Sequence, residues 1–318
     1  MPLNPTPPPS NPSARTVTVD AEHDGQRIDN FLLAMLKGAP RTLVYRILRS
    51  GEVRVNSGRI KPSYRVEQGD VVRIPPIRLA PAKIDPEVPP AAEQRIKDCI
   101  IFEDGDLIVF NKPSGMAVHG GSGISHGVIE SLRVIMPLTK RLELVHRLDR
   151  DTSGCLLIAK KASVLKSLHD QMRDGTTEKI YLALVKGETD VAHWDVTAPL
   201  VKNVASSGER VVRVREDGKE SHTIFSLRQR FNGATLVEAK LLTGRTHQIR
   251  VHGTHSGHPL AGDEKYGDAQ FNKDMRTLGL KRLFLHARTL TFKHPGTGKD
   301  YTANAPLPRE LSEFLKKL

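Results

Sequence analysis

The chain has 318 residues, of which 38% are hydrophobic and 26% are charged, as in ordinary globular proteins of one large domain or two. Its 48 Lys and Arg against 36 Asp and Glu leave a net charge of +12, which favours a polyanionic partner such as nucleic acid. No apolar run reaches the roughly 18–20 residues of a membrane span. The opening residues, MPLNPTPPPSNPS, lack the basic and apolar regions of a signal peptide. Cys99 and Cys155 form no C-x-x-C pattern, so we expect a cytoplasmic chain without a disulfide framework.

Proline marks the expected domain boundaries. Six of the 21 prolines lie in residues 1–14, and six more lie between residues 75 and 97. Clusters of this kind are typical of disordered tails and of semi-extended linkers. We therefore expect a Pro-rich tail (1–14), a small first domain (15–76), a linker (77–97) and a large second domain (98–318).

The first domain combines helices and short strands. Apolar residues at helical spacing predict a helix within residues 27–37, and a second helix over 41–49 stops before Gly51. Short strands are expected at 52–56, 64–66 and 71–75, separated by Asn, Ser, Gly and Asp turn residues.

The charge of this domain is one-sided. Residues 37–65 contain eight basic residues and one acidic residue, Glu52. A basic surface on the second helix and the following turn would contact nucleic-acid phosphates, although a solvated helix face would show the same pattern. The expected RNA-binding residues are Arg41, Arg46, Arg49, Arg54, Arg59 and Lys61.

Residues 26–75 resemble the S4 RNA-binding domain, a small α/β module of ribosomal proteins and RNA-modifying enzymes. The resemblance covers the paired helices, the VN-x-G turn and the Gly-Asp before the last strand. It favours the phosphate-binding interpretation of the basic residues.

The residue pattern of the second domain predicts many short strands and few helices. Strands are expected at 98–104, 106–113, 143–147, 155–159, 179–185, 211–215, 221–227, 234–242 and 283–292, and helices near 126–135, 162–172 and 308–317. This pattern predicts an α+β fold with a large mixed or antiparallel sheet.

The segment HRLDRDTSG (146–154) concentrates one His, two Arg and two Asp between two apolar strands. A loop over a rigid scaffold is a common position for functional residues, and an ion-pair cluster closing a strand connection would look alike. Asp149 and Asp151 are too close in sequence to flank a glycosidic bond as an acid/base pair. One carboxylate, kept ionised by neighbouring arginines, fits the pattern better.

HRLDRDTSG resembles the signature of the RNA pseudouridine synthases whose catalytic domain is built around one aspartate. Further segments of that family follow in the expected order: NKPSGMAVH (111–119), EKIYLALV (178–185), LLTGRTHQIRVH (241–252), AGDEKYG (261–267) and RLFLHA (282–287). The resemblance spans the second domain almost from end to end, and HGGSG (119–123) and the S4-like domain point to its ribosomal large-subunit members.

This resemblance implies that Asp149 is the essential carboxylate and that Arg245 is its ionic partner. It also implies that Tyr181 stacks on the target uracil and that Arg147 displaces the base from its stack. The implied substrate is uridine at several positions of 23S (large-subunit) ribosomal RNA. Because the reaction is an isomerisation, no redox cofactor, nucleotide or metal is required, and a monomer is expected.

Rival interpretations remain open. A sister enzyme would act on transfer RNA or on other ribosomal uridines, an inactive copy would be an RNA-binding assembly factor, and a nucleoside hydrolase would release free base. Histidines 247, 252, 255 and 258 are spaced like metal ligands but match no zinc motif.

Overall fold

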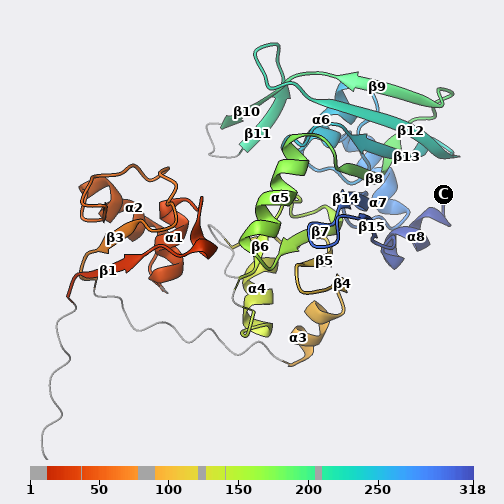
Figure 1. The fold of residues 1–318 in the computed structure, drawn as a ribbon. Helices are drawn as coiled ribbons and strands as arrows, with labels where there is room; N and C mark the ends of the chain where they lie inside the picture. Colours follow the sequence, from red (N-terminus) through yellow and green to blue (C-terminus); the bar gives the residue numbers. More distant parts are fainter. Residues whose placement is uncertain (1–12, 37, 78–89, 121–126, 140, 205–209) are drawn as a thin grey trace, which may run out of the picture. The chain divides into compact units, whose positions relative to one another are not determined.

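The computed structural model describes residues 13–36, 38–77, 90–120, 127–139, 141–204 and 210–318. The chain forms two compact units, Met1–Glu87 and Val88–Leu318 (Figure 1). Residues 1–12 of the expected tail and 78–89 of the expected linker lie outside the described residues.

The first unit packs two helices on a three-stranded sheet. Helices α1 (Ile28–Met35) and α2 (Arg41–Ser50) bury their apolar stripes against strands β1 (Arg15–Thr18), β2 (Arg54–Val55) and β3 (Val71–Ile74), in the order β1-β3-β2. A short 3-10 helix, η1 (Ala21–His23), follows β1. Helix α2 ends at Gly51, whose φ of 74° suits a residue without Cβ.

Both predicted helices of this unit are confirmed, and the strands are confirmed in part. Residues 64–66 form only an isolated antiparallel bridge, between Arg65 and Arg27, because the partner segment turns into helix α1 at Ile28. Strand β1 was not predicted, since four residues with a mostly exposed pattern give a weak signal.

The second unit is built on a ten-stranded sheet with the order β4-β5-β7-β14-β8-β13-β12-β9, to which β15 and β6 add at β14 and β7. All neighbours are antiparallel except β7 and β14, which run parallel. The strands are β4 (Ile100–Glu103), β5 (Leu107–Lys112), β6 (Glu143–Leu144), β7 (Ser153–Ala159), β8 (Glu178–Lys186), β9 (His193–Thr197), β12 (His222–Phe231), β13 (Ala234–Leu241), β14 (Leu285–Lys293) and β15 (Asp300–Asn304). A separate hairpin joins β10 (Leu200–Val204) and β11 (Arg210–Val214). The predicted α+β class with a large mixed sheet is confirmed.

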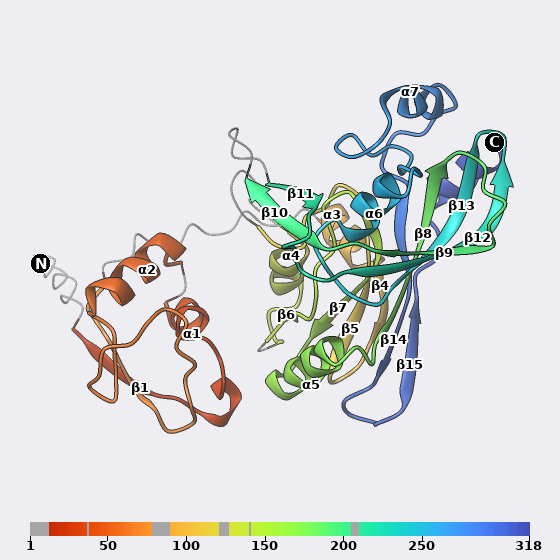
Figure 2. The ribbon, with the colours of Figure 1, turned by 90° about the horizontal axis from the view of Figure 1, so that it is seen from above.

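Helices cover both faces of this sheet because side chains alternate along each strand. Helix α5 (Ala162–Arg173) packs Val164 and Leu168 on one face, beside β7 and β14 (Figure 2). Helices α4 (Val128–Ile135) and α6 (Gln248–His255) pack on the face that carries Tyr181. Helices α7 (Ala269–Thr277) and α8 (Arg309–Leu315) share a further apolar cluster with Leu184 and Phe284.

The last part of the expected linker is helical instead. Helix α3 (Pro90–Lys97) has proline at its first position, where no N–H is needed, followed by the good helix formers Ala, Ala, Glu and Gln. Ile96 and the following Cys99 pack on the main apolar cluster, so α3 belongs structurally to the second unit.

Strands β9, β10 and β15 and helices α6 and α7 were also missed. Helix α6 is polar in sequence (QIRVHGTH), yet it buries residues on every side, so it shows little helical periodicity.

The centre of the sheet places the functional segments side by side. Gly154, Ala287 and Tyr181 form one row across β7, β14 and β8. Gly154 has a φ of 112°, and a Cβ there would lie 2.2 Å from the carbonyl oxygen of Ala287. This close approach requires glycine, and it brings the loop of Asp149 next to Tyr181.

Candidate active site

Asp149 lies in the loop that leads into β7, with its side chain 27% exposed. The loop is anchored by Lys112, which is fully buried and donates hydrogen bonds to the carbonyls of Pro113, Met116 and Arg150. Burial lowers the pKa of Lys112 to about 7. Three carbonyl acceptors satisfy this buried amine, and they tie the NKPSG loop to the residues that follow Asp149.

The ionic partner of Asp149 is Arg250, and the expectation that Arg245 fills this position is wrong. Arg250 Nη1 lies 3.3 Å from Asp149 Oδ2. Arg245 is exposed, and its Nε donates instead to the carbonyl of Glu220 at 3.1 Å. Both arginines belong to GRTHQIR, but Arg245 precedes α6 while Arg250 lies in it, and only the folded helix decides which one faces Asp149.

Arg250 is itself held by Asp263, a residue that sequence reasoning did not single out. Its Nε and Nη2 bind the two carboxylate oxygens of Asp263 at 2.7 and 2.8 Å. Burial opposes the charge of Asp263, but the hydrogen bonds and the positive charge of Arg250, together with backbone N–H donors, hold the pKa of Asp263 below its usual value. The backbone N–H groups of Lys265 and Tyr266 also donate to Asp263. The signal for this anchor was the AGDEKYG segment, whose turn supplies both the carboxylate and its donors.

Gly267 closes that turn. Its N–H donates to the carbonyl of Asp263, and a Cβ at this position would lie 2.2 Å from that oxygen. Glycine is therefore required for the turn that presents Asp263 to Arg250.

Tyr181 lies on β8 beside Asp149 and is 9% exposed. Burial raises the pKa of Tyr181, and the charge of Asp149 adds to this effect. The phenol therefore stays neutral at physiological pH. Tyr181, Asp149, Arg250, Arg147 and Arg245 line one small cavity of about 60 Å³.

The cavity is well below the roughly 300 Å³ of common small-molecule sites. The side chain of Arg147 is exposed and has no hydrogen-bond or ion-pair partner among the described residues. The side chain of Arg147 can therefore change its conformation.

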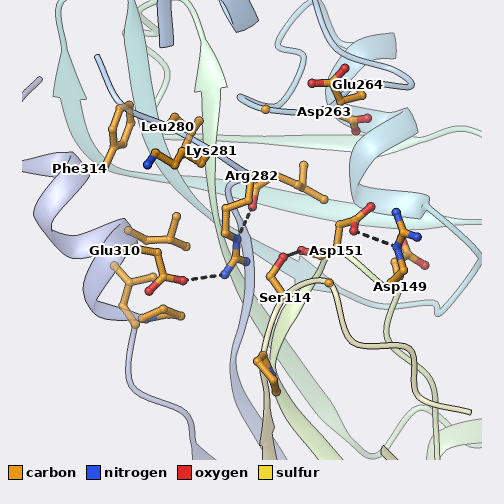
Figure 3. Close-up of a pocket in the computed structure, with 18 of the residues that line it drawn as sticks. Ser114, Asp149, Asp151, Asp263, Glu264, Leu280, Lys281, Arg282, Glu310 and Phe314 are labelled. Atoms are coloured by element: carbon orange, nitrogen blue, oxygen red, sulfur yellow. Dashed lines mark hydrogen bonds and ion pairs between the residues drawn. The ribbon is translucent and has the colours of Figure 1, made fainter. Parts of the chain in front are cut away.

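A second, larger cavity of about 1530 Å³ also reaches Asp149. Figure 3 shows Asp149 and Asp151 at one side of it and Glu310 and Phe314 at the other. Arg282 lies between them and donates to Glu310 and to the hydroxyl of Ser153. Asp149 is thus open to solvent from two directions.

The basic residues expected to bind RNA in the first unit lie mostly at its surface. Arg46, Arg49 and Lys61 are exposed, and Arg54 is half-buried. Arg59 is exposed but its Nη2 donates to the carbonyl of Ser50, which caps the end of α2. The side chain of Arg41 lies outside what the structure describes.

The four spaced histidines do not form a metal site in the described part of the chain. There, the group of ligand atoms close enough to hold a metal belongs to Asp104, Asp106 and His294. In this group Oδ2 of Asp104 lies 2.9 Å from Nε2 of His294, and Asp106 forms an ion pair with Lys161. His252 is a core residue that bonds to Thr223 and Ala198.

These features define an RNA-modifying isomerase: an S4 domain matches residues 26–72, and the RNA pseudouridylate synthase profile matches residues 106–255. The chain belongs to this family of pseudouridine synthases. It is 54% identical over 97% of its length to a Yersinia pestis protein named ribosomal large subunit pseudouridine synthase C, of which 97% is covered. The protein of the same name from Escherichia coli K12 is 53% identical over 96% of this chain and 97% of its own.

Solved structures agree with this assignment. Human RNA pseudouridylate synthase domain containing 4 superposes with a TM-score of 0.59 at 25% identity, covering 71% of this chain and 95% of the human one. Human RNA pseudouridylate synthase domain containing 1 gives a TM-score of 0.55 at 26% identity, covering 66% and 83%. Among the described residues, no helix combines the length and apolar character of a membrane span.

Proposed function

We propose that this chain converts uridines of large-subunit ribosomal RNA to pseudouridine, at more than one position. The observation that carries the proposal is the Asp149 carboxylate, paired with Arg250 and opening into a cavity walled by Tyr181. The names of the relatives, which are near-complete matches in length, support the ribosomal substrate.

The reaction exchanges one bond for another. The bond between N1 of uracil and C1′ of ribose breaks, the freed base turns, and C5 bonds to C1′ while the hydrogen on C5 leaves as a proton and N1 gains one. A carboxylate that faces the sugar or the base is the group this chemistry needs. Arg250 contacts Oδ2 of Asp149, and no described residue donates a hydrogen bond to Oδ1, so Oδ1 is the atom offered to the nucleotide.

The other residues hold the detached base. The neutral ring of Tyr181 lines the cavity and offers a face on which the uracil can stack while it turns. Arg147, at the mouth of the cavity, is placed to occupy the gap that a displaced nucleotide leaves in its stack. Arg245 lies at the same mouth, where we propose it contacts RNA.

The first unit supplies affinity that does not depend on sequence. We propose that Arg46, Arg49 and Lys61 contact phosphates, with Arg41, Arg54 and Arg59 around them. We propose that the chain acts as a monomer in the cytoplasm, and two free cysteines fit a reducing compartment. Size-exclusion chromatography with light scattering tests the oligomeric state. A monomer should have the mass of one chain, 35.2 kDa, and a dimer would have about twice that mass.

Tritium release from C5 of uridine tests the function. Wild-type protein should release tritium from unmodified large-subunit ribosomal RNA, and Asp149→Asn should release none while binding RNA within several-fold of wild type. Mapping the modified positions then counts the targets. Turnover by Asp149→Asn would refute the assignment of the carboxylate, release of free uracil would make the protein a hydrolase, and tritium release only from transfer RNA would make it a sister enzyme.

A further inference from the structure

His247 stands beside the catalytic carboxylate in an unusual backbone conformation. Its φ is 55° and its ψ is 19°, the left-handed region that residues with a Cβ rarely adopt. Its Nε2 lies 3.7 Å from Oδ2 of Asp149, the same oxygen that Arg250 contacts. Strained residues of this kind persist where the surrounding structure holds them, often at functional sites.

The surroundings of the ring determine which of its nitrogens carries the proton. The backbone N–H of Val212, on β11, donates to the hydroxyl oxygen of Tyr266 at 3.0 Å. The hydroxyl of Tyr266 lies 2.7 Å from Nδ1 of His247. Since the tyrosine oxygen already accepts from Val212, its own proton is satisfied when it is donated to Nδ1.

The remaining proton of a neutral imidazole is then on Nε2. Burial lowers the pKa of His247, and the charged groups facing the ring are Asp149, Arg250, Lys265 and Asp263. A ring that is neutral at pH 7 and accepts at Nδ1 must donate at Nε2, toward Asp149.

Tyr266 contacts both partners of the carboxylate. Its hydroxyl meets His247, and its ring lies under the guanidinium of Arg250, with 5.0 Å from Cζ to the ring centroid. Its own N–H donates to Asp263, the anchor of Arg250. One side chain therefore fixes the two groups that converge on a single oxygen of Asp149.

We propose that Tyr266 holds His247 as the Nε2–H tautomer and that this N–H, with Arg250, fixes Oδ2 of Asp149 so that Oδ1 faces the uridine. Both are positioning residues, since they act through Asp149. The separation of 3.7 Å shortens to a hydrogen bond when substrate closes the site, as catalytic hydrogen bonds often do. The inference rests on the proposed function.

Two substitutions of His247 distinguish this role from a structural one. Asparagine tolerates the left-handed backbone and can still accept a proton from Tyr266, but it is too short to reach Asp149. Glutamine is the poorer fit to the backbone, yet its amide can place an N–H where Nε2 stood. If the donor to Asp149 matters, His247→Gln keeps a higher kcat than His247→Asn, even though His247→Asn has the higher melting temperature.

Tyr266→Phe removes only the hydroxyl and keeps the ring over Arg250. We expect kcat for tritium release to fall by about 10- to 100-fold, as for other losses of alignment, while KM for the RNA changes by less than about twofold. In full-length protein labelled with ¹⁵N-histidine, NMR should show His247 as the Nε2–H tautomer, and Tyr266→Phe should change that signal. The signal of His247 is assigned as the one that is missing from the spectrum of His247→Gln.

Three results would overturn the inference: an Nδ1–H tautomer in the wild type, a kcat for His247→Asn at or above that of His247→Gln, or unchanged kcat in Tyr266→Phe. The NMR measurement needs no RNA. If the wild type released no tritium from any RNA, the proposed function would fail, and the positioning role would fail with it. An active wild type with an Nδ1–H ring would remove this inference and leave the function standing.

Discussion

Replacing Arg250 by methionine keeps most of the apolar stem and removes the guanidinium that compensates Asp263. The Asp263 side chain is only 1% exposed, so its carboxylate would remain buried without a counter-charge. Removing one partner of a buried ion pair costs about 3–5 kcal/mol. Because Asp263 keeps the N–H donors of Lys265 and Tyr266, we expect the lower end, about 3 kcal/mol.

That loss should be visible in thermal unfolding. For a unit of this size each kcal/mol shifts the melting temperature by about 2–4 °C, so Arg250→Met should melt about 6–12 °C below the wild type. Turnover should fall by about 100- to 1000-fold, the range seen when one preorganised electrostatic partner is removed. Circular dichroism gives the first quantity and tritium release the second.

A second substitution separates the two effects. In Arg250→Met/Asp263→Asn the uncompensated charge is gone, so most of the melting temperature should return while turnover stays lost. Arg245→Met is the matched control, since Arg245 is exposed and bonds a backbone carbonyl; its stability should stay within about 0.5 kcal/mol of wild type. Recovery of turnover in the double variant would refute the reasoning. So would an equal loss of melting temperature in Arg250→Met and Arg245→Met.

Two further predictions concern pH and salt. Burial lowers the pKa of His286 to about 4, below the ordinary value of about 6.5, so its contribution to stability is complete above pH 6.5 and is lost as the pH falls toward 4, by up to about 3 kcal/mol. Urea unfolding at pH 7 and 4.5 should show a smaller loss in His286→Gln, and equal losses would contradict this role. Arg46→Ala/Arg49→Ala should lower the slope of log Kobs against log salt by about 2. Lys293→Ala/Lys299→Ala, which removes the same charge from the β14–β15 hairpin, should leave the slope unchanged, and equal effects of the two pairs would argue against the S4 surface.

The sequence by itself predicted elements with strong local signals. Helices α1, α2 and α5 and strands β5, β7, β8 and β13 follow from apolar periodicity, because a buried stripe or an alternating face appears directly in the order of residues. The helical part of the expected linker and the polar helix α6 were not predicted from the sequence, since the partners that bury them are distant in sequence.

The residues of the candidate site also fall into those that the sequence predicted and those that only the structure identified. The charged composition of HRLDRDTSG fitted either a functional loop or an ion-pair cluster, and Asp149 and Tyr181 were singled out by the resemblance of HRLDRDTSG and EKIYLALV to pseudouridine synthase motifs. Tertiary structure alone decided that Arg250 and not Arg245 meets Asp149, and that Asp263 and Tyr266 hold that arginine. Residue type and spacing show which groups are present, but an ion pair forms only between groups that packing brings within a few ångströms, and here β7, β8, α6 and the 262–267 turn had first to come together.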